Sequence, residues 1–172
     1  MRGNITLIGM PASGKSTLGR RLAEKLGYEF VDVDRIIEAE EKRLLKEIIA
    51  EEGDDGFLEI ENRVNAGLCL ERSVIAPGGS VIYGKEAMEH LKEIGVIVYL
   101  KLSFEEMEKR IGNPVERGVV LKQGMTLKKL YEERTPYYDR YADVVLDETG
   151  FNLEESVDHL IDMLESKGIQ GE

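Results

Sequence analysis

Short, continuous runs of apolar residues alternate along the chain with longer stretches that have a helical pattern. We interpret the runs as β-strands, because a strand that is apolar at successive positions is buried on both faces of its sheet. Strands that alternate with helices form parallel sheets with helices on both sides. The pattern therefore predicts a three-layer α/β/α fold around about five parallel strands, at Ile5–Ile8, Glu29–Val33, Val74–Ala76, Val96–Leu100 and Val144–Leu146.

Three helical stretches bear on the candidate site. Leucines at every fourth position and a following glycine predict a helix over Lys15–Leu26. A second pattern predicts a helix over Phe57–Glu71, within which Cys69 is expected to be a small buried residue. A third segment has a helical pattern from Thr126 until Pro136, where the missing N–H of proline favours a break.

The segment Gly9-Met10-Pro11-Ala12-Ser13-Gly14-Lys15-Ser16 matches the phosphate-binding pattern G-x-x-x-x-G-K-[ST], between the first predicted strand and helix. Its glycines permit backbone angles that turn successive N–H groups toward one anionic volume. Lys15 brings a positive charge to the outer phosphates, and the Ser16 hydroxyl can bind Mg²⁺. The positive end of the helix dipole also attracts the phosphates. We expect nucleoside triphosphate binding; the alternative is a glycine-rich turn.

Two carboxylates follow the second predicted strand, in Asp32-Val33-Asp34. Residues at i and i+2 of an extended strand point the same way. One carboxylate can hold a Mg²⁺-bound water, and the other can accept a proton from an acceptor hydroxyl. In the alternative interpretation, Asp34 only caps a helix that starts at Arg35.

Two further segments are candidates for an acceptor site. Gly78 and Gly79 follow the third predicted strand, where they either allow close approach to a ligand or form only a tight turn. In the helix predicted from Phe57, Glu61 lies about 40° from the centre of the apolar stripe, which favours a basic partner or a role in a site. Leu58 lies toward Glu61 and either lines a pocket or is an ordinary edge residue.

Residues 111–124 have the composition of a mobile lid, with glycines, a proline and Arg117 between them. A guanidinium on such a segment can reach a phosphate when the lid closes; the alternative is a solvated loop arginine. Arg134 stands beside the expected break at Pro136.

Composition narrows the choice of partners. Of 172 residues, 23 are Lys or Arg and 34 are Asp or Glu, so the net charge is −11 and nucleic-acid binding is not expected. A single cysteine excludes an intrachain disulfide and agrees with a cytoplasmic protein.

We expect neither a membrane span nor a signal peptide, because no apolar run is long enough and a core strand begins near the N-terminus. The length fits one domain over residues 1–172.

The order and spacing of these residues resemble the shikimate kinase family, small P-loop enzymes related to the nucleoside monophosphate kinases. The resemblance runs from Asn4 to about Leu164. It implies a P-loop NTPase fold and a cytoplasmic, often monomeric kinase that uses ATP and Mg²⁺ to phosphorylate a hydroxyl of shikimate. The residues that carry it are Gly9–Ser16, Asp32–Asp34, Phe57, Glu61, Pro77–Gly79, Arg110, Arg117, Glu133–Tyr138 and Ala142–Val144.

The resemblance also implies individual roles. Asp34 would bind and deprotonate the acceptor hydroxyl, Arg117 would neutralise the transferring phosphoryl group, and Arg134 would be one of two arginines on the substrate carboxylate. Lys15 would join Asp34 and Arg117 in catalysis, and Asp32 would join Ser16 at Mg²⁺. The expected nucleotide contacts are Gly9, Ala12, Ser13, Gly14, Lys15, Ser16, Thr17 and Arg110; the expected acceptor contacts, within a region of about 34–62 and beyond it, are Asp34, Phe57, Leu58, Glu61, Gly78, Gly79 and Arg134.

Two positions depart from the family pattern, both on the acceptor side. Leu58 stands where the family has an arginine, and Pro77 replaces the first residue of a glycine triplet. One lost charge-assisted contact weakens binding by about 1.5–3 kcal/mol. Three hypotheses therefore stay open: a shikimate kinase, a kinase of another small hydroxylated metabolite, and a nucleotide-binding regulatory protein without turnover.

Overall fold

The computed structural model describes residues 3–112 and 124–168. Over these residues, a parallel sheet of five strands has the order β2-β3-β1-β4-β5. The predicted parallel sheet is confirmed, and each strand differs from its predicted bounds by at most one residue at either end. The strands are β1 (Asn4–Ile8), β2 (Glu29–Asp32), β3 (Ser73–Ala76), β4 (Gly95–Lys101) and β5 (Val144–Asp147).

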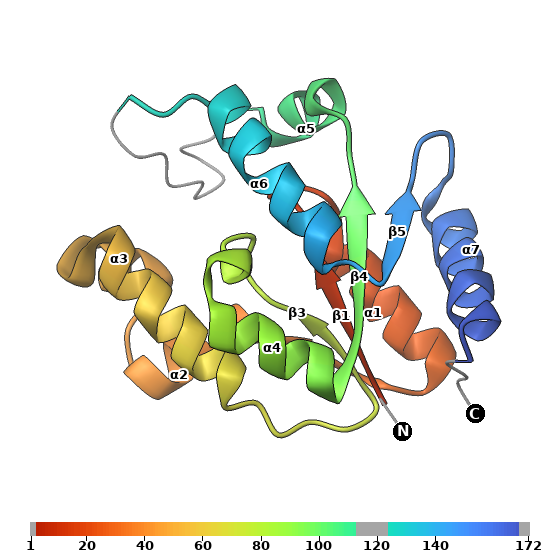
Figure 1. The fold of residues 1–172 in the computed structure, drawn as a ribbon, viewed down its shortest axis with the longest axis horizontal. Helices are drawn as coiled ribbons and strands as arrows, with labels where there is room; N and C mark the ends of the chain where they lie inside the picture. Colours follow the sequence, from red (N-terminus) through yellow and green to blue (C-terminus); the bar gives the residue numbers. More distant parts are fainter. Residues whose placement is uncertain (1–2, 113–123, 169–172) are drawn as a thin grey trace.

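Helices cover both faces of this sheet, as the alternating pattern predicts (Figure 1). One face is covered by α1 (Lys15–Leu26) and α7 (Leu153–Ser166), which pack together. The opposite face is covered by α2 (Val33–Glu41), α3 (Leu45–Ala66), the short 3₁₀ helix η1 (Val81–Tyr83) and α4 (Lys85–Ile94). Helices α5 (Phe104–Ile111) and α6 (Leu127–Tyr141) contribute residues to the same core.

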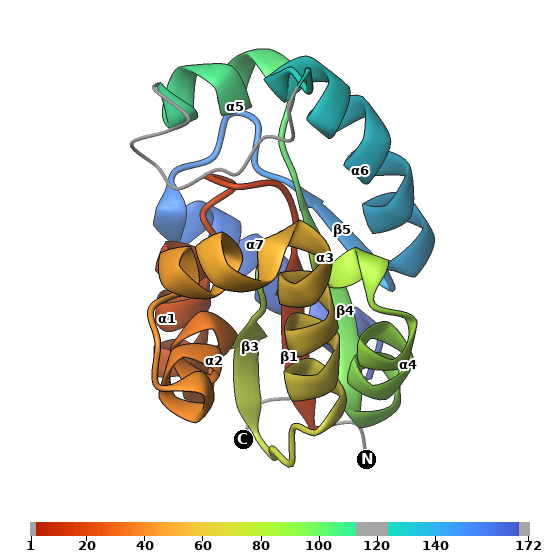
Figure 2. The same cartoon turned by 90° about the vertical axis from the view of Figure 1, so that its left-hand side faces the viewer.

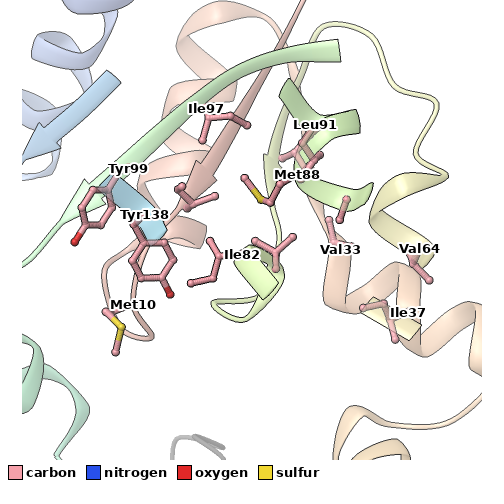
Figure 3. Packing of buried hydrophobic residues seen from close by; sticks show 14 of the residues in the cluster. Met10, Val33, Ile37, Val64, Ile82, Met88, Leu91, Ile97, Tyr99 and Tyr138 are labelled. Carbon is pink, nitrogen blue, oxygen red and sulfur yellow. The ribbon is translucent and has the colours of Figure 1, made fainter. Parts of the chain in front are cut away.

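The side chains of β4 explain why the strands are apolar at successive positions. Ile97 and Tyr99 belong to the core beneath α2 to α6, shown in Figure 3. Val96, Val98 and Leu100 belong to the second core, beneath α1 and α7. Successive strand residues point to opposite faces, so a sheet between two helical layers needs apolar residues at both.

Two predictions about where helices end are wrong. Helix α3 ends at Ala66, and Cys69 lies in the following loop, where it is exposed and not buried. Helix α6 continues through Pro136 to Tyr141. Pro136 and Glu132, the residue four positions earlier, are both exposed, so water can bind the carbonyl that loses its partner.

Helices α5 and α6 lie beyond the carboxyl ends of the strands, and α3 crosses in front of the sheet (Figure 2). In open parallel sheets ligands bind at this end. None of the helices in residues 3–112 and 124–168 is both long enough and apolar enough to cross a membrane.

Candidate functional site

A cavity of about 470 Å³ opens at the carboxyl ends of the strands. Its wall combines the phosphate-binding loop, the end of β2, the first turn of α2, the first part of α3, the turn after β3, and α6. The cavity therefore brings together segments that are far apart in the sequence. The predicted site residues among its lining are Lys15, Ser16, Asp32, Asp34, Phe57, Leu58, Glu61, Gly78, Gly79 and Arg134.

The loop between β1 and α1 has the open shape needed for phosphate oxygens. Gly9 has φ +155°, and a Cβ there would stand 2.9 Å from both the Leu100 carbonyl and Ser13 Oγ. Gly14 has φ +87°, and no side chain caps the helix that follows it. Ala12 also has a positive φ, 64°. These angles turn the backbone around a concave space, so the free N–H groups at the start of α1 are available to an anion.

Lys15 is folded back over this loop. Its Nζ donates hydrogen bonds to the carbonyl oxygens of Gly9 and Met10, at 2.9 and 2.8 Å. Burial lowers the pKa of Lys15 to about 8, against the opposing charge of Asp34. A desolvated ammonium beside open backbone amides is a strong site for phosphate oxygens.

Oxygen ligands suitable for Mg²⁺ lie next to the loop. Ser16 and Thr17 stand exposed in the first turn of α1, and Asp32 lines the cavity from the end of β2. Oδ1 of Asp32 accepts the backbone N–H of Asp34, at 3.1 Å. Within the described residues, no group of three or more His, Cys, Asp or Glu could hold a metal ion. A hydroxyl and one carboxylate fit an ion that is also bound by phosphates.

Asp34 lies in the first turn of α2, not at the end of the strand. β2 ends at Asp32, which caps α2, so neither the predicted extension of the strand to Val33 nor a cap role for Asp34 is correct. Burial raises the pKa of Asp34 to about 6, the nearby charge of Asp32 adds to this, and Lys15 opposes it. A carboxylate with a raised pKa at a cavity wall is suited to accept a proton near neutral pH.

Helix α3 supplies an apolar wall and one buried carboxyl group. Phe57 and Leu58 line the cavity, as the pocket interpretation of Leu58 predicted. Glu61 is 2% exposed, and burial raises its pKa to about 7. The sequence analysis favoured a basic partner for Glu61 or a role in a site. The hydrogen bond that it makes comes instead from Ser80, at 2.6 Å to Oε1.

The turn after β3 packs tightly against these side chains. A Cβ on Gly78 would stand 2.5 Å from Glu61 Oε2, and a Cβ on Gly79 would stand 3.1 Å from Nη1 of Arg134. A side chain at either position would therefore displace the Glu61 carboxyl group or crowd the Arg134 guanidinium. The Arg134 guanidinium lies over the ring of Tyr83, 5.6 Å from its centroid.

Arg110 lies apart from the acceptor wall, on α5. Its Nε donates to Glu106 at 3.0 Å, and its Nη1 is 3.8 Å from Glu148 of the loop after β5. A Cβ on Gly14 would stand 4.0 Å from the same Glu148 oxygen, so Glu148 lies near both Arg110 and the phosphate-binding loop. Arg117 and most of the expected lid, 111–124, lie outside the described residues.

Several contacts at the cavity and next to it were not predicted from the sequence. Ser80 contacts Glu61, and Tyr138 donates to the Gly79 carbonyl at 2.6 Å while it stacks on Tyr99. The hydrogen bond of Tyr138 was not predicted, although a buried tyrosine O–H usually has a partner. Leu45 and Ile49 extend the apolar wall of α3.

Comparison with known proteins gives one consistent result. A family model described as shikimate kinase matches residues 11–165. A shikimate kinase of Persephonella marina is 36% identical over 148 residues, which are 86% of this chain and 90% of that protein. One of Clostridium botulinum is 41% identical over 147 residues, 83% of this chain and 86% of that protein.

Solved structures agree with these sequence matches. The shikimate kinase of Acinetobacter baumannii in complex with shikimate has a TM-score of 0.87 and 29% identity, over 98% of this chain and 96% of that one. A deoxyadenosine kinase of M. mycoides has a TM-score of 0.58 at 16% identity, over 95% of this chain and 99% of that one. At that identity the similarity extends to the fold alone.

Proposed function

The chain belongs to the shikimate kinase family, and we propose that it transfers the γ-phosphoryl group of ATP to a hydroxyl of shikimate. Family membership makes it an ATP-dependent phosphotransferase that acts on a hydroxyl group, and it confirms the resemblance read from the sequence. The identity of the acceptor and the role of each site residue are what we propose.

On the nucleotide side, the open loop of Gly9–Ser16 supports a triphosphate site. We assign the phosphates to the loop amides and to Lys15, whose ammonium is desolvated beside Gly9 and Met10. Arg110 would lie on the base side and Arg117 would reach the transferring group from the lid, 111–124. Mg²⁺ held by Ser16 and, through water, by Asp32 would offset the charge of the phosphates.

On the acceptor side, Asp34 and Arg134 support a bound hydroxy acid. The Asp34 carboxylate would accept the proton of the acceptor hydroxyl as the new oxygen–phosphorus bond forms and ADP departs. Arg134 would bind the acceptor carboxylate, beside Gly79. Phe57 and Leu58 would contact the ring. Catalysis in this scheme is positioning and charge stabilisation in a cavity from which water is excluded.

The observation that carries the proposal is the placement of Lys15, Asp34 and Arg134 around one cavity. A second candidate is a kinase of another small hydroxylated metabolite. It is favoured by the apolar stretch of the wall formed by Leu45, Ile49 and Leu58. Besides Lys15 of the phosphate-binding loop, Arg134 is the one cation among the described lining residues. A carboxylate acceptor would then be held by one guanidinium, with a weaker affinity.

Release of ADP from Mg²⁺ and ATP, with and without millimolar shikimate, tests the proposal. We expect strong stimulation by shikimate and incorporation of one phosphate into it. If ATP binds but shikimate does not stimulate ADP release, other hydroxylated metabolites are screened. Stimulation by one of them would support the second candidate. If none stimulates ADP release, the protein is a nucleotide-binding protein without this turnover.

We further propose that the chain works as a cytoplasmic monomer, built as one P-loop kinase domain over 1–172 with an acceptor region of about 34–62. The single cysteine and the net charge of −11 support a reducing compartment and a small-molecule partner in place of nucleic acid. Light scattering of the purified protein tests the oligomeric state.

A further inference from the structure

Ser80 links two walls of the cavity through its side chain. It follows the glycine turn after β3, lines the cavity, and donates a hydrogen bond of 2.6 Å to Glu61 Oε1 on α3. Glu61 is 2% exposed, so this hydroxyl holds a carboxyl group that has almost no contact with water. A hydrogen bond to a buried charged or chargeable group is among the stronger ones in a protein.

The second oxygen of Glu61 is confined by the backbone. Among the described residues, Oε2 is buried and has no hydrogen-bond partner. A Cβ on Gly78 would stand 2.5 Å from it. Oε1 is bound to Ser80 and Oε2 lies close to Gly78, so both contacts restrict the orientation of the carboxyl group.

That orientation matters because of the groups that face Glu61. They are Asp34 from α2 and Arg134 from α6, together with Tyr138 from α6 and the Ser80 hydroxyl. The charge of Asp34 raises the pKa of Glu61, and Arg134 lowers it. Asp34 and Arg134 are also the residues to which we assign the acceptor hydroxyl and carboxylate. A shift of the Glu61 carboxyl would therefore change the field at both ends of the acceptor.

We propose that Ser80 is a positioning residue of the acceptor site, which acts by fixing the carboxyl group of Glu61 between Asp34 and Arg134. This inference rests on the proposed function for the identity of the acceptor, but not for the contact itself. It differs from a purely structural role, because the turn is also held from α6 by the hydrogen bond of Tyr138 to the Gly79 carbonyl.

A double-mutant cycle tests the proposal. We expect Ser80→Ala to raise the KM for shikimate about tenfold, the effect of one hydrogen bond, with the KM for ATP changed by less than about twofold. Ser80→Thr, which keeps the hydroxyl, should restore most of the loss. Glu61→Gln keeps the acceptor oxygen but removes its charge. In this background Ser80→Ala should have a clearly smaller effect, because a hydrogen bond to a neutral amide oxygen is about half as strong as one to a carboxylate.

Ser166→Ala is the matched control, since its hydroxyl donates to the Met163 carbonyl at the end of α7, far from the cavity. It should leave both KM values unchanged. Equal losses for acceptor and ATP, or full additivity with Glu61→Gln, would overturn the proposal. Should Glu61→Gln not fold, the comparison of Ser80→Ala with Ser80→Thr still decides.

A second readout separates this inference from the proposed function. The titration of the Glu61 carboxyl carbon, followed by NMR, needs no acceptor. Loss of a hydrogen bond to the charged form should raise the pKa of Glu61 in Ser80→Ala above that of the unsubstituted protein. An unchanged titration would overturn the inference even in an active shikimate kinase. A raised pKa in a protein that does not turn over shikimate would leave the contact supported and the acceptor assignment wrong.

Discussion

The nucleotide side and the acceptor side of the cavity are built in different ways. The nucleotide side is one continuous segment, Gly9–Ser16, whose shape comes from backbone angles at Gly9 and Gly14. The acceptor side is an assembly of side chains from α2, α3 and α6 around the turn after β3. A backbone site is fixed by a few residue types, whereas a side-chain site can be altered one position at a time. This difference fits a chain that matches the phosphate-binding pattern at every fixed position and has the apolar Leu58 on the acceptor wall.

The largest effect is expected on the nucleotide side, at Lys15. We expect Lys15→Ala to lower kcat/KM by at least about 10²- to 10³-fold, because it removes the charge that faces the phosphates. ADP release under saturating shikimate measures this. Lys25→Ala is the control on the same helix, since Lys25 pairs with Glu154 and Asp158 on the other side of the protein. An active Lys15→Ala variant would contradict the assignment of the loop.

Asp34→Asn is the corresponding change on the acceptor side. We expect kcat to fall by about 10²- to 10⁴-fold, the usual contribution of a general base, with ATP affinity retained. In the unsubstituted enzyme, kcat/KM for shikimate should fall as the pH drops below about 6, since the pKa of Asp34 is raised to about 6 and its protonated form cannot accept a proton. A flat profile between about pH 7 and pH 5 would argue against Asp34 as the base.

Substitution of Arg117 tests whether the lid acts on the transferring phosphoryl group or on ATP binding. We expect Arg117→Ala to lower kcat by about 10²-fold or more and to change the ATP dissociation constant much less, because its charge acts on the transferring group. Equilibrium ATP binding and steady-state kinetics together measure the two effects. Arg43→Ala is a suitable control, as Arg43 pairs with Glu41, Glu51 and Glu52 outside the cavity lining. Equal losses in binding and turnover would contradict the lid assignment.

Leu58→Arg would add a second guanidinium to the acceptor side of the cavity. Leu58 lies three residues before Glu61, so a guanidinium there can reach both the cavity and the unpaired Glu61 oxygen. We expect the KM for shikimate to fall about tenfold and the KM for ATP to stay within about twofold. Leu58→Met, of similar volume and without charge, should leave both nearly unchanged. No gain with Leu58→Arg would mean that the wall is built for a different acceptor.

The smallest expected effect concerns stability. The pKa of Asp34 is raised from 3.8 to about 6 on folding, so the charged form destabilises the native state above about pH 6 and the penalty is relieved as the pH falls toward 4. Asp34→Asn should therefore raise the melting temperature at about pH 8 by about 2–4 °C, with a gain that shrinks toward about pH 4. Asp55→Asn, on an exposed part of α3, is the charge-matched control. A gain equal to that of the control would show that Asp34 carries no burial penalty.

Local patterns predicted the sheet and the phosphate-binding loop closely. Strand positions follow from runs of apolar residues, and the bounds of α1 follow from Lys15 and the αL cap at Gly27. Two predictions about helix ends failed. Helix α6 passes Pro136 because the freed carbonyl is on its exposed side, and the helix expected through Cys69 ends at Ala66.

By itself the sequence determined the fold class, the phosphate-binding loop and about half of the residues that line the cavity. Glycine angles, apolar periodicity and a lysine at fixed spacing act locally, so the fold class and the loop can be predicted from the sequence. Only the tertiary structure decided that Glu61 accepts from Ser80, that Tyr138 holds Gly79, and that Asp34 and Arg134 both influence the buried carboxyl of Glu61. These contacts join residues far apart in the chain, and the pKa of a buried carboxyl depends on every charge around it. Such quantities exist only after the sheet and its helices have packed.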